Sequence, residues 1–551
     1  MSENIKITVN GNELEAKSGE LLIEACEKSG IHIPRFCWHK RLDPVGMCRM
    51  CLVEVETPRG KALVPSCTTE ITEDLVVETE SEVVTKAQEG ILEFLLINHP
   101  LDCPVCDKAG ECPLQDQTMA YGPGESRFVE EKRHFEKPIP ISEIILLDRE
   151  RCILCARCTR FSDEISGDPL IEFIQRGNKT EVNTFPDEPF RSYFSGNTVQ
   201  ICPVGALTST SYRFKARPWD LKKVSSTCNC CSVGCSIELN TSQNKMLRIL
   251  GEDNEFTNQG WLSDKGRYNF DYLHSENRLL NILSKSEDSF NEISISEATK
   301  KIKNKIDELD NPNVKFLVGS SSTNEEYFII NEIANYLNKD KFLSKDSSNI
   351  YFGDDLLFKG YFEDEYSQAK LEDLDSSDTI VIWAEDIKDN LPILYLRVKK
   401  AVKNGSKLIV FGHTNTAIAG LADFYFGKDI VSNKFELIQN PNEIEDLKNN
   451  IEGKKVTIIA GKSTVFQKKE SLDKLINYLN ENSELKVLNS FSKGNTFGAL
   501  QNLDEVKGLN EFCNEFDNNA KNIVFTIGVN PVNSSYFGKK IKENLIASDF
   551  V

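Results

Sequence analysis

Residues 151–158 read RCILCARC, and a Cys-Pro step follows at residues 202–203. The stretch supplies three cysteines at C-x2-C-x2-C spacing, and the Cys-Pro step supplies a fourth. These four are Cys152, Cys155, Cys158 and Cys202. A triad with a remote Cys-Pro is the arrangement of bacterial [4Fe-4S] ferredoxin sites. With one triad and one Cys-Pro, we expect a single four-iron cube in a compact unit over residues 142–215.

The cysteines are unevenly distributed along the chain. Sixteen of the 17 lie before residue 236, and the exception is Cys513. The N-terminus lacks a basic flank followed by an apolar core, so we expect a reducing compartment in which C-x2-C pairs indicate metal or redox chemistry rather than disulfides. The N-terminal half is therefore predicted to bind metal.

Charge and hydropathy exclude two classes of partner. Lys and Arg number 65 and Asp and Glu 85, a net charge of −20, which repels nucleic acid and anionic lipid. No apolar run approaches the ~20 residues that cross a bilayer. We expect no nucleic acid partner and no direct membrane span, on a chain that stays at the cytoplasmic side.

A second cysteine set, nearer the N-terminus, has x10, x2 and x15 spacing: Cys37, Cys48, Cys51 and Cys67. A C-x2-C pair with one distant cysteine on each side can wrap four thiolates around a [2Fe-2S] core. Alternating residues 4–9, the Asn10-Gly11 turn, residues 12–16 and a helix over about 20–29 capped by Ser18 predict a ferredoxin-like unit ending near residue 82. This context favours iron-sulfur over zinc, which also accepts four thiolates.

A third set has the spacing H-x3-C-x2-C-x5-C: His99, Cys103, Cys106 and Cys112. It follows a helix predicted over about 83–97. A histidine four residues ahead of three clustered cysteines favours a [4Fe-4S] cube with one imidazole ligand, with zinc as the competitor. Cys26, in contrast, is an isolated thiol on a predicted helix and is expected to fill the core.

A fourth set is incomplete. Three cysteines at C-x2-C-x3-C spacing have no fourth partner until Cys513: Cys228, Cys231 and Cys235. A three-thiolate site can hold an incomplete cluster or recruit a serine oxygen, and the alternative is a vestigial site whose thiols pack. We favour the absence of a third [4Fe-4S] cluster here, so the set remains a tentative metal site.

Beyond residue 280, apolar β-branched runs alternate with helical stretches. The runs cover residues 314–318, 379–383, 408–411, 456–460 and 523–527. This rhythm predicts an α/β unit with a mainly parallel sheet. No G-x-G-x-x-G, Walker or G-x-S-x-G motif occurs, so neither a nucleotide site nor a nucleophile is indicated. Three predicted clusters without a substrate pocket imply one-electron relay and no catalytic residue on this chain.

Four longer segments resemble the G subunit of bacterial NADH-quinone oxidoreductase, which is the 75 kDa subunit family of respiratory complex I. They read GMCRMCLVEV at 46–55, EFLLINHPLDCP at 93–104, GECPLQD at 110–116 and ICPVGALT at 201–208. The likeness is close over about 1–280, and looser over 281–551, which resembles the molybdopterin-oxidoreductase-like domain of that family.

The resemblance implies a multi-domain α+β and α/β fold. Its parts are a [2Fe-2S] ferredoxin-like β-grasp domain (1–82), a His(Cys)3-type [4Fe-4S] domain (83–122), a [4Fe-4S] ferredoxin-like domain (142–215), a Mo/W-bis-MGD-type 4Fe-4S domain that is degenerate if vestigial (221–277) and an α/β domain (281–551). We expect one [2Fe-2S] and two [4Fe-4S] clusters, no FMN and no molybdopterin.

The resemblance also implies an electron path. The binuclear set would accept electrons from the FMN-bearing NADH dehydrogenase subunit, the set at 152–202 would follow, and the His99 set would pass them to a subunit holding two further cubes, toward quinone. The complex would couple this flow to proton translocation through separate membrane subunits, and this chain would be peripheral at the cytoplasmic side of the inner (plasma) membrane.

Two departures from the family stand out. In members of the family with an additional cube the pattern continues C-x2-C-x3-C-x27-C, which places the fourth ligand on Ser263 in this chain. The family's C-terminal domain also usually runs beyond residue 551, so a shortened chain, a split subunit and an incomplete sequence are all open. The alternatives in function are an iron-sulfur subunit of a formate dehydrogenase or NAD-linked hydrogenase, and a zinc scaffold. A molybdenum enzyme would need a longer C-terminal portion than these roughly 270 residues.

Overall fold

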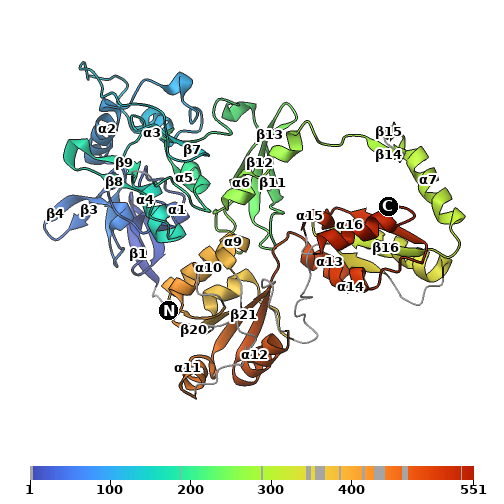
Figure 1. The fold of residues 1–551 in the computed structure, drawn as a ribbon. Helices are drawn as coiled ribbons and strands as arrows, with labels where there is room; N and C mark the ends of the chain where they lie inside the picture. The colour runs from blue at the N-terminus through green and yellow to red at the C-terminus, as the bar shows by residue number, and fades with distance from the viewer. Residues whose placement is uncertain are drawn as a thin grey trace. The chain divides into compact units, whose positions relative to one another are not determined.

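The computed structural model describes residues 4–185, 188–286, 289–342, 349–353, 366–383, 386–412, 416–426, 441–461, 469–534 and 537–551. It divides into two compact units, coloured along the chain in Figure 1. One unit comprises Met1–Val224, Glu238–Leu250 and Leu262–Arg267, and the other comprises Ser225–Ile237, Gly251–Trp261 and Tyr268–Val551. Among the described residues, no helix has the length and apolar character needed to span a bilayer.

The first unit begins with a five-stranded sheet in the order β2-β1-β5-β3-β4. Its strands are β1 (Asn4–Val9), β2 (Asn12–Lys17), β3 (Leu52–Thr57), β4 (Gly60–Pro65) and β5 (Val76–Glu78). The predicted hairpin at Asn10-Gly11 is confirmed, since β1 pairs antiparallel with β2 and both turn residues have positive φ. Helix α1 (Leu22–Lys28) packs on the sheet.

The predicted cap of α1 is wrong. The helix begins after Leu21, whose extended backbone carries no side-chain cap, and not at Ser18. Leu21 instead bridges to Glu70, while the backbone N–H of Leu22 donates to Thr69. Tertiary pairing therefore replaces the local cap. Cys26 is fully buried in this core, as predicted, and burial raises the pKa of its thiol to about 11.

The rest of the first unit is built from short elements linked by loops. Helix α2 (Glu82–Ile97) is capped by Ser81 and confirms the helix predicted over 83–97. After it come a 3-10 turn (Cys103–Val105), α3 (Pro113–Tyr121), β6 (Ile139–Pro140), β7 (Ile145–Leu147), α4 (Arg157–Arg160) with a π-helical extension (Phe161–Ser166), β8 (Ile171–Ile174), β9 (Glu181–Thr184), α5 (Gly196–Ile201) and β10 (Leu207–Ser209). One core joins residues from α2, β7, β10 and the cysteine loops.

A three-stranded sheet in the order β11-β12-β13 follows: β11 (Lys222–Thr227), β12 (Ser236–Ser242) and β13 (Lys245–Gly251). The chain then passes α6 (Asp264–Tyr268), a 3-10 turn (Asp271–His274) and a hairpin of β14 (Ile282–Ser286) and β15 (Ser289–Ile293).

Every apolar run predicted beyond residue 280 is a strand with parallel partners. The structure corrects the expectation of one mainly parallel sheet, because the described residues of this region form two parallel sheets. The four-stranded sheet runs β23-β17-β16-β24, from β16 (Asn313–Val318), β17 (Ile350–Phe352), β23 (Val506–Lys507) and β24 (Asn522–Ile527). The five-stranded sheet runs β20-β19-β18-β21-β22, from β18 (Thr379–Trp383), β19 (Lys407–Phe411), β20 (Phe424–Phe426), β21 (Lys455–Gly461) and β22 (Glu484–Ser490).

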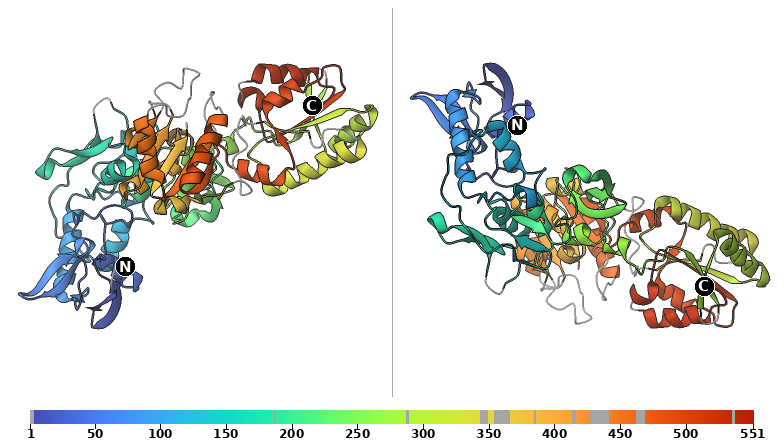
Figure 2. Two further views of the ribbon diagram at one scale, coloured as in Figure 1. Left: turned by 90° about the horizontal axis from the view of Figure 1, so that it is seen from below. Right: turned by 90° about the horizontal axis from the view of Figure 1, so that it is seen from above.

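Helices cover both faces of the four-stranded sheet, which explains why its strands are apolar without alternation. Figure 2 shows the olive helices on one face and the red C-terminal helices on the other. The first face packs on α7 (Ile295–Glu308), α8 (Asn324–Asn335) and α13 (Thr496–Asn502), and the second packs on α14 (Leu509–Asn514) and α16 (Gly538–Ala547). The final residues add a parallel bridge from Phe550 to Ile523.

The five-stranded sheet is also covered by helices. Its core includes apolar side chains of α11 (Pro441–Ile451) and α12 (Lys469–Asn482). Helix α10 (Pro392–Lys403) buries most of its side chains, and Arg397 on it donates to carbonyl groups of Glu255 and Thr257. Two short helices, α9 (Ile387–Asn390) and α15 (Pro531–Ser534), complete the second unit.

Candidate iron-sulfur sites

The structure brings the four cysteines of the C-x2-C-x2-C and Cys-Pro set together. All four line one apolar pocket with Leu147, Val182 and Val204: Cys152, Cys155, Cys158 and Cys202. The thiols of Cys152, Cys155 and Cys158 each interact with the charge of at least one other cysteine of the set. We call this pocket the triad site. Its apolar lining and four convergent sulfurs fit the donor set of a [4Fe-4S] cube.

The backbone of the triad site adopts an uncommon conformation. Leu154 and Ala156 have φ of 54° and 60°, in the left-handed region that non-glycine residues rarely occupy. The two residues flank Cys155, and the N–H of Leu154 donates to the sulfur of Cys152 at 3.4 Å. Such strain persists only where the surroundings fix it, and it is typical of functional loops.

Burial controls the protonation of three of these thiols. It raises the pKa of Cys155 to about 11, and it raises the pKa of Cys152 and Cys158 further, with mutual repulsion of the thiolates adding to the effect. A metal that binds such thiols must displace their protons, and its positive charge offsets the repulsion. The site is therefore suited to a metal centre more than to free thiolates.

The binuclear set also converges, and we call it the binuclear site. Cys37 follows α1, Cys48 and Cys51 precede β3, and Cys67 lies in a 3-10 turn after β4. The N–H of Cys37 donates to the sulfur of Cys48 at 3.4 Å, and the N–H of Cys48 donates to the sulfur of Cys37 at 3.5 Å. Gly46 has a φ of 58°, and a Cβ placed on it would stand 3.2 Å from the side chain of Thr68.

The thiols of the binuclear site share hydrogen bonds. Hydrogen bonds from Cys48 and then Cys67 lower the pKa of Cys37, and a hydrogen bond from Cys67 lowers that of Cys51. The pKa values of the two donors, Cys48 and Cys67, are raised by the same contacts. Pairs of thiols in contact match the way in which a binuclear core takes two sulfurs on each iron.

The histidine set lies between α2 and α3. Cys103 is exposed in a 3-10 turn, whereas Cys106 and Cys112 are buried, and burial raises the pKa of both. The charge of Cys103 contributes to the raised pKa of Cys106, and the charge of Cys106 contributes to the raised pKa of Cys112. A Cβ placed on Gly205 would stand 2.2 Å from the sulfur of Cys106. Residue 205 must therefore be a glycine if the thiol of Cys106 is to keep its position.

His99 lies two residues after the end of α2, and its backbone N–H donates to the carbonyl of Leu96 at 3.1 Å. Its Nδ1 is buried without a hydrogen-bond partner among the described residues, which is uncommon for a buried polar atom. Burial, followed by the charges of Lys132 and Arg151, lowers the pKa of His99 to about 4. The imidazole is therefore neutral at physiological pH, the form that ligates metal. We call this set the histidine site.

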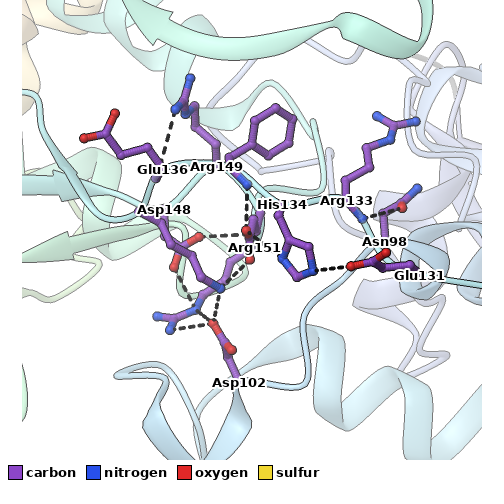
Figure 3. A network of polar contacts seen from close by, with 12 residues as sticks. Asn98, Asp102, Glu131, Arg133, His134, Glu136, Asp148, Arg149 and Arg151 are labelled. Carbon is purple, nitrogen blue, oxygen red and sulfur yellow. Dashed lines mark hydrogen bonds and ion pairs between the residues drawn. The ribbon is translucent and has the colours of Figure 1, made fainter.

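A polar network around Asp102 and Arg151 connects the loop before Cys103 to the loop before Cys152 (Figure 3). Arg151 donates through Nε and Nη2 to one oxygen of Asp102, at 3.0 and 2.9 Å, and pairs with Asp148 at 3.1 Å. Lys137 joins Asp102 at 2.8 Å and also pairs with Glu150. Asp102 precedes Cys103, and Arg151 precedes Cys152, so the network ties the loops of the two sites together.

His99 and Cys152 also line one cavity of about 180 Å³, with Phe94, Phe135 and Arg149 among the other lining residues. Across the described residues, no three His, Cys, Asp or Glu side chains surround a position for a single metal ion. The triad site is defined instead by a shared pocket and the binuclear site by contacts between its thiols. The cavity that His99 lines contains Cys152 and none of the cysteines of its own set.

Two arginines that the sequence analysis did not single out reach the binuclear site from α4. Arg157 donates from Nη2 to the carbonyl of Trp38 at 2.7 Å and from Nη1 to the carbonyl of Ile201 at 3.1 Å. Arg160 donates to the carbonyl groups of Asp43 and Cys37. A charged residue inside an otherwise apolar cysteine motif is the signal that could have identified Arg157.

The incomplete set lies in the second unit. The N–H of Cys228 donates to the carbonyl of Cys235 at 2.8 Å, and a hydrogen bond with Cys230 raises the pKa of Cys228. Ser263, at the position of the family's fourth ligand, accepts a hydrogen bond from the N–H of Gly266 at 3.3 Å. Its oxygen therefore serves the start of the short helix α6.

Models of known protein families match five stretches of the chain. Residues 2–82 match the 2Fe-2S iron-sulfur cluster binding domain, 88–127 the NADH-ubiquinone oxidoreductase-G iron-sulfur binding region, and 142–208 the ferredoxin-like domain of NADH-quinone oxidoreductase subunit 3. Residues 221–275 match the molybdopterin oxidoreductase Fe4S4 domain, and 274–551 match molybdopterin oxidoreductase. The chain is thus an iron-sulfur protein with 2Fe-2S and 4Fe-4S binding domains and a molybdopterin-oxidoreductase-like C-terminal region.

Several relatives specify the family further. The chain is 57% identical over 272 residues to the G subunit of NADH-quinone oxidoreductase from Mycobacterium bovis, covering 49% of this chain and 34% of the relative. It is 53% identical over 277 residues to the G subunit from Streptomyces coelicolor, a match that covers 50% of this chain and 33% of the relative. It is 37% identical over 410 residues to the NADH-ubiquinone oxidoreductase 75 kDa subunit of Reclinomonas americana, a match that covers 73% of this chain and 59% of the relative. The chain belongs to the family of NADH-quinone oxidoreductase G subunits.

The chain spans between a third and three fifths of the length of these relatives. A solved structure of an NAD+-reducing [NiFe]-hydrogenase in the H2-reduced state is also similar, with 26% identity over 39% of this chain and 90% of that chain. Its TM-score of 0.34 is too low to indicate a shared fold.

Proposed function

We propose that this chain is an electron-transfer subunit of an NADH:quinone oxidoreductase. It carries one [2Fe-2S] cluster at the binuclear site and one [4Fe-4S] cluster at each of the triad and histidine sites. The observation that carries the proposal is the convergence of all four triad cysteines on one apolar pocket. When bound, the clusters supply one-electron chemistry, which needs no substrate pocket.

The residues of this chain have three roles in such a relay. Thiols and one imidazole hold the iron, the apolar linings exclude water, and the buried arginines fix the loops. Aromatic and aliphatic side chains of one core surround the cysteine loops of the sites. A dry surrounding and a fixed spacing are what electron transfer between clusters requires.

We further propose the partners and the place of the chain. It would receive electrons from an FMN-bearing, NADH-oxidising subunit and deliver them to a subunit with two further cubes, toward quinone. The whole complex would couple this flow to proton translocation, with this chain peripheral at the cytoplasmic side of the membrane. Support comes from the names and identity of the relatives.

No cluster is proposed at the incomplete cysteine set. The oxygen of Ser263 is engaged by Gly266, and Cys228 shares a hydrogen bond with Cys230. The FMN and molybdopterin cofactors are likewise assigned to no residue of this chain.

The relay is tested in the intact complex by the substitution Cys202→Ser, with Cys26→Ser as the matched control. NADH oxidation with ferricyanide draws electrons near the flavin, whereas quinone reduction needs the whole relay. We expect Cys202→Ser to abolish NADH:quinone activity and to leave NADH:ferricyanide activity near the wild-type rate. Quinone reduction at the wild-type rate in an assembled Cys202→Ser complex would contradict the proposal.

A further inference from the structure

The guanidinium of Arg157 lies between two of the three sites. One of its terminal nitrogens bonds to the carbonyl of Trp38, the residue after Cys37, and the other bonds to the carbonyl of Ile201, the residue before Cys202. Arg157 itself stands inside the triad, between Cys155 and Cys158. Three segments that are distant in sequence, and two sites, are therefore joined by one side chain.

The charge of Arg157 acts on sulfurs of both sites. It interacts with Cys155 and Cys202 of the triad site and with Cys37 and Cys48 of the binuclear site. The Nε atom is buried and has no hydrogen-bond partner among the described residues. Arginine keeps its charge in nearly every protein environment, so this is a permanent cation between the two sites.

We propose that Arg157 is a positioning residue for electron transfer that sets the spacing of the clusters at the binuclear and triad sites and raises the midpoint potentials of both. Reduction adds one negative charge to a cluster, and a nearby cation stabilises that added charge. One cation that interacts with both sites therefore favours the reduced form of each. The inference rests on the cluster assignments of the proposed function.

Arg160 makes a variant of Arg157 interpretable. It lies three residues later on α4 and donates to the carbonyl groups of Cys37, Asp43 and Ala156. The loop after Cys37 is thus still attached to α4 when Arg157 is changed. Loss of the Arg157 charge can then be measured with the two loops held together.

The test is a potentiometric titration of the purified complex, followed by electron paramagnetic resonance. The variants are Arg157→Met, which removes the charge at similar length, and Arg157→Lys, which keeps the charge but cannot span both carbonyl groups. Arg35→Met is the matched control, because Arg35 stacks on Trp38 at 4.6 Å while its charge is paired with Glu27.

We expect Arg157→Met to lower the midpoint potentials of the binuclear and triad clusters and to leave that of the histidine-site cluster in place. Arg157→Lys should keep both potentials near wild type while changing the magnetic interaction between the two clusters, which reports their spacing. Arg35→Met should move neither potential. Unchanged potentials in Arg157→Met, or a shift of only one cluster, would overturn the inference.

If Arg157→Met loses a cluster, Arg157→Gln replaces it, and the expected shifts are the same. Loss of clusters in the Met, Gln and Lys variants alike would overturn the electrostatic role and leave Arg157 a purely structural one. Failure of the proposed function is a different result, because the wild-type complex would then show no iron-sulfur signals from this chain at all.

Discussion

Arg151 donates two hydrogen bonds, at 3.0 and 2.9 Å, to a single carboxylate oxygen of Asp102. The side chain of Arg151 is only 5% exposed. A buried guanidinium needs such partners, and here the partner belongs to the loop of the neighbouring site. The Asp102–Arg151 pair is thus a fixed joint between the histidine site and the triad site (Figure 3).

The first prediction concerns this joint. Asp102→Asn removes one charge from the network and should destabilise the two loops by about 1–3 kcal/mol, because a charged hydrogen bond on a buried group is lost. We expect faster hydrogen exchange in peptides spanning residues 99–112 and faster iron release to a chelator. Glu93→Gln is the control, because its partner Arg127 is exposed and ion pairs at the surface contribute little to stability. Equal effects of the two substitutions would contradict the role of the joint.

The second prediction concerns Gly205. A Cβ at this position would meet the sulfur of Cys106 at 2.2 Å, so Gly205→Ala forces the thiol away from its place. We expect loss of the histidine-site cluster alone, seen as a drop of about four iron atoms per chain with the other two signals retained. The control Gly90→Ala lies in α2 with nothing near its added Cβ and should keep all iron, while stabilising the helix by about 1 kcal/mol. Full iron content in Gly205→Ala would refute the prediction.

The third prediction concerns the second unit and its pH dependence. Buried Lys315 donates to the hydroxyl of Tyr351 at 2.9 Å, and that hydroxyl donates to Glu515 at 2.7 Å. Burial raises the pKa of Glu515, but the hydrogen bonds from Tyr351 and Lys507 outweigh it, and the net shift is downward from 4.5. A lowered pKa means that the charged carboxylate stabilises the fold above pH 4.5, and that this contribution is lost as the pH falls through the lowered value.

Glu515→Gln should therefore lower the resistance of β16 and β17 to urea at pH 7, and the difference from wild type should shrink below pH 4.5. Hydrogen exchange of the peptides covering these strands, measured in increasing urea, reports this unit separately from the first one. Lys521→Gln, at an exposed pair with Asp549, serves as the control. A difference that stays constant down to pH 3 would show that the charge of Glu515 is not responsible.

Local sequence patterns were sufficient for much of the molecule. The hairpin at Asn10-Gly11, helix α2 and the apolar strands beyond residue 280 all follow from turn chemistry and hydrophobic periodicity. The start of α1 did not, because pairing of Leu21 with Glu70 is a tertiary contact. The division into two parallel sheets was also missed, since strand order depends on contacts between distant segments.

The candidate sites show the same difference between features that follow from local sequence and features that depend on tertiary contacts. Cysteine spacing predicted the three ligand sets, and the four thiols of the triad set line one pocket. Iron binding by the three sets stays a prediction. Spacing could not reveal Arg157, whose hydrogen-bond partners Ile201 and Trp38 lie 44 and 119 residues away in the sequence. It could not reveal the Asp102–Arg151 pair either, whose two members are 49 residues apart. Such residues become visible only when the loops of different motifs are folded together.

The central claim is that twelve side chains hold iron in three clusters. The most direct measurement is quantification of iron, acid-labile sulfide, zinc and molybdenum in anaerobically purified complex, with electron paramagnetic resonance after reduction to identify the clusters of this chain. The account predicts about ten iron and about ten sulfide attributable to this chain, from one binuclear and two tetranuclear signals, with negligible zinc and molybdenum. Stoichiometric zinc without acid-labile sulfide would contradict it.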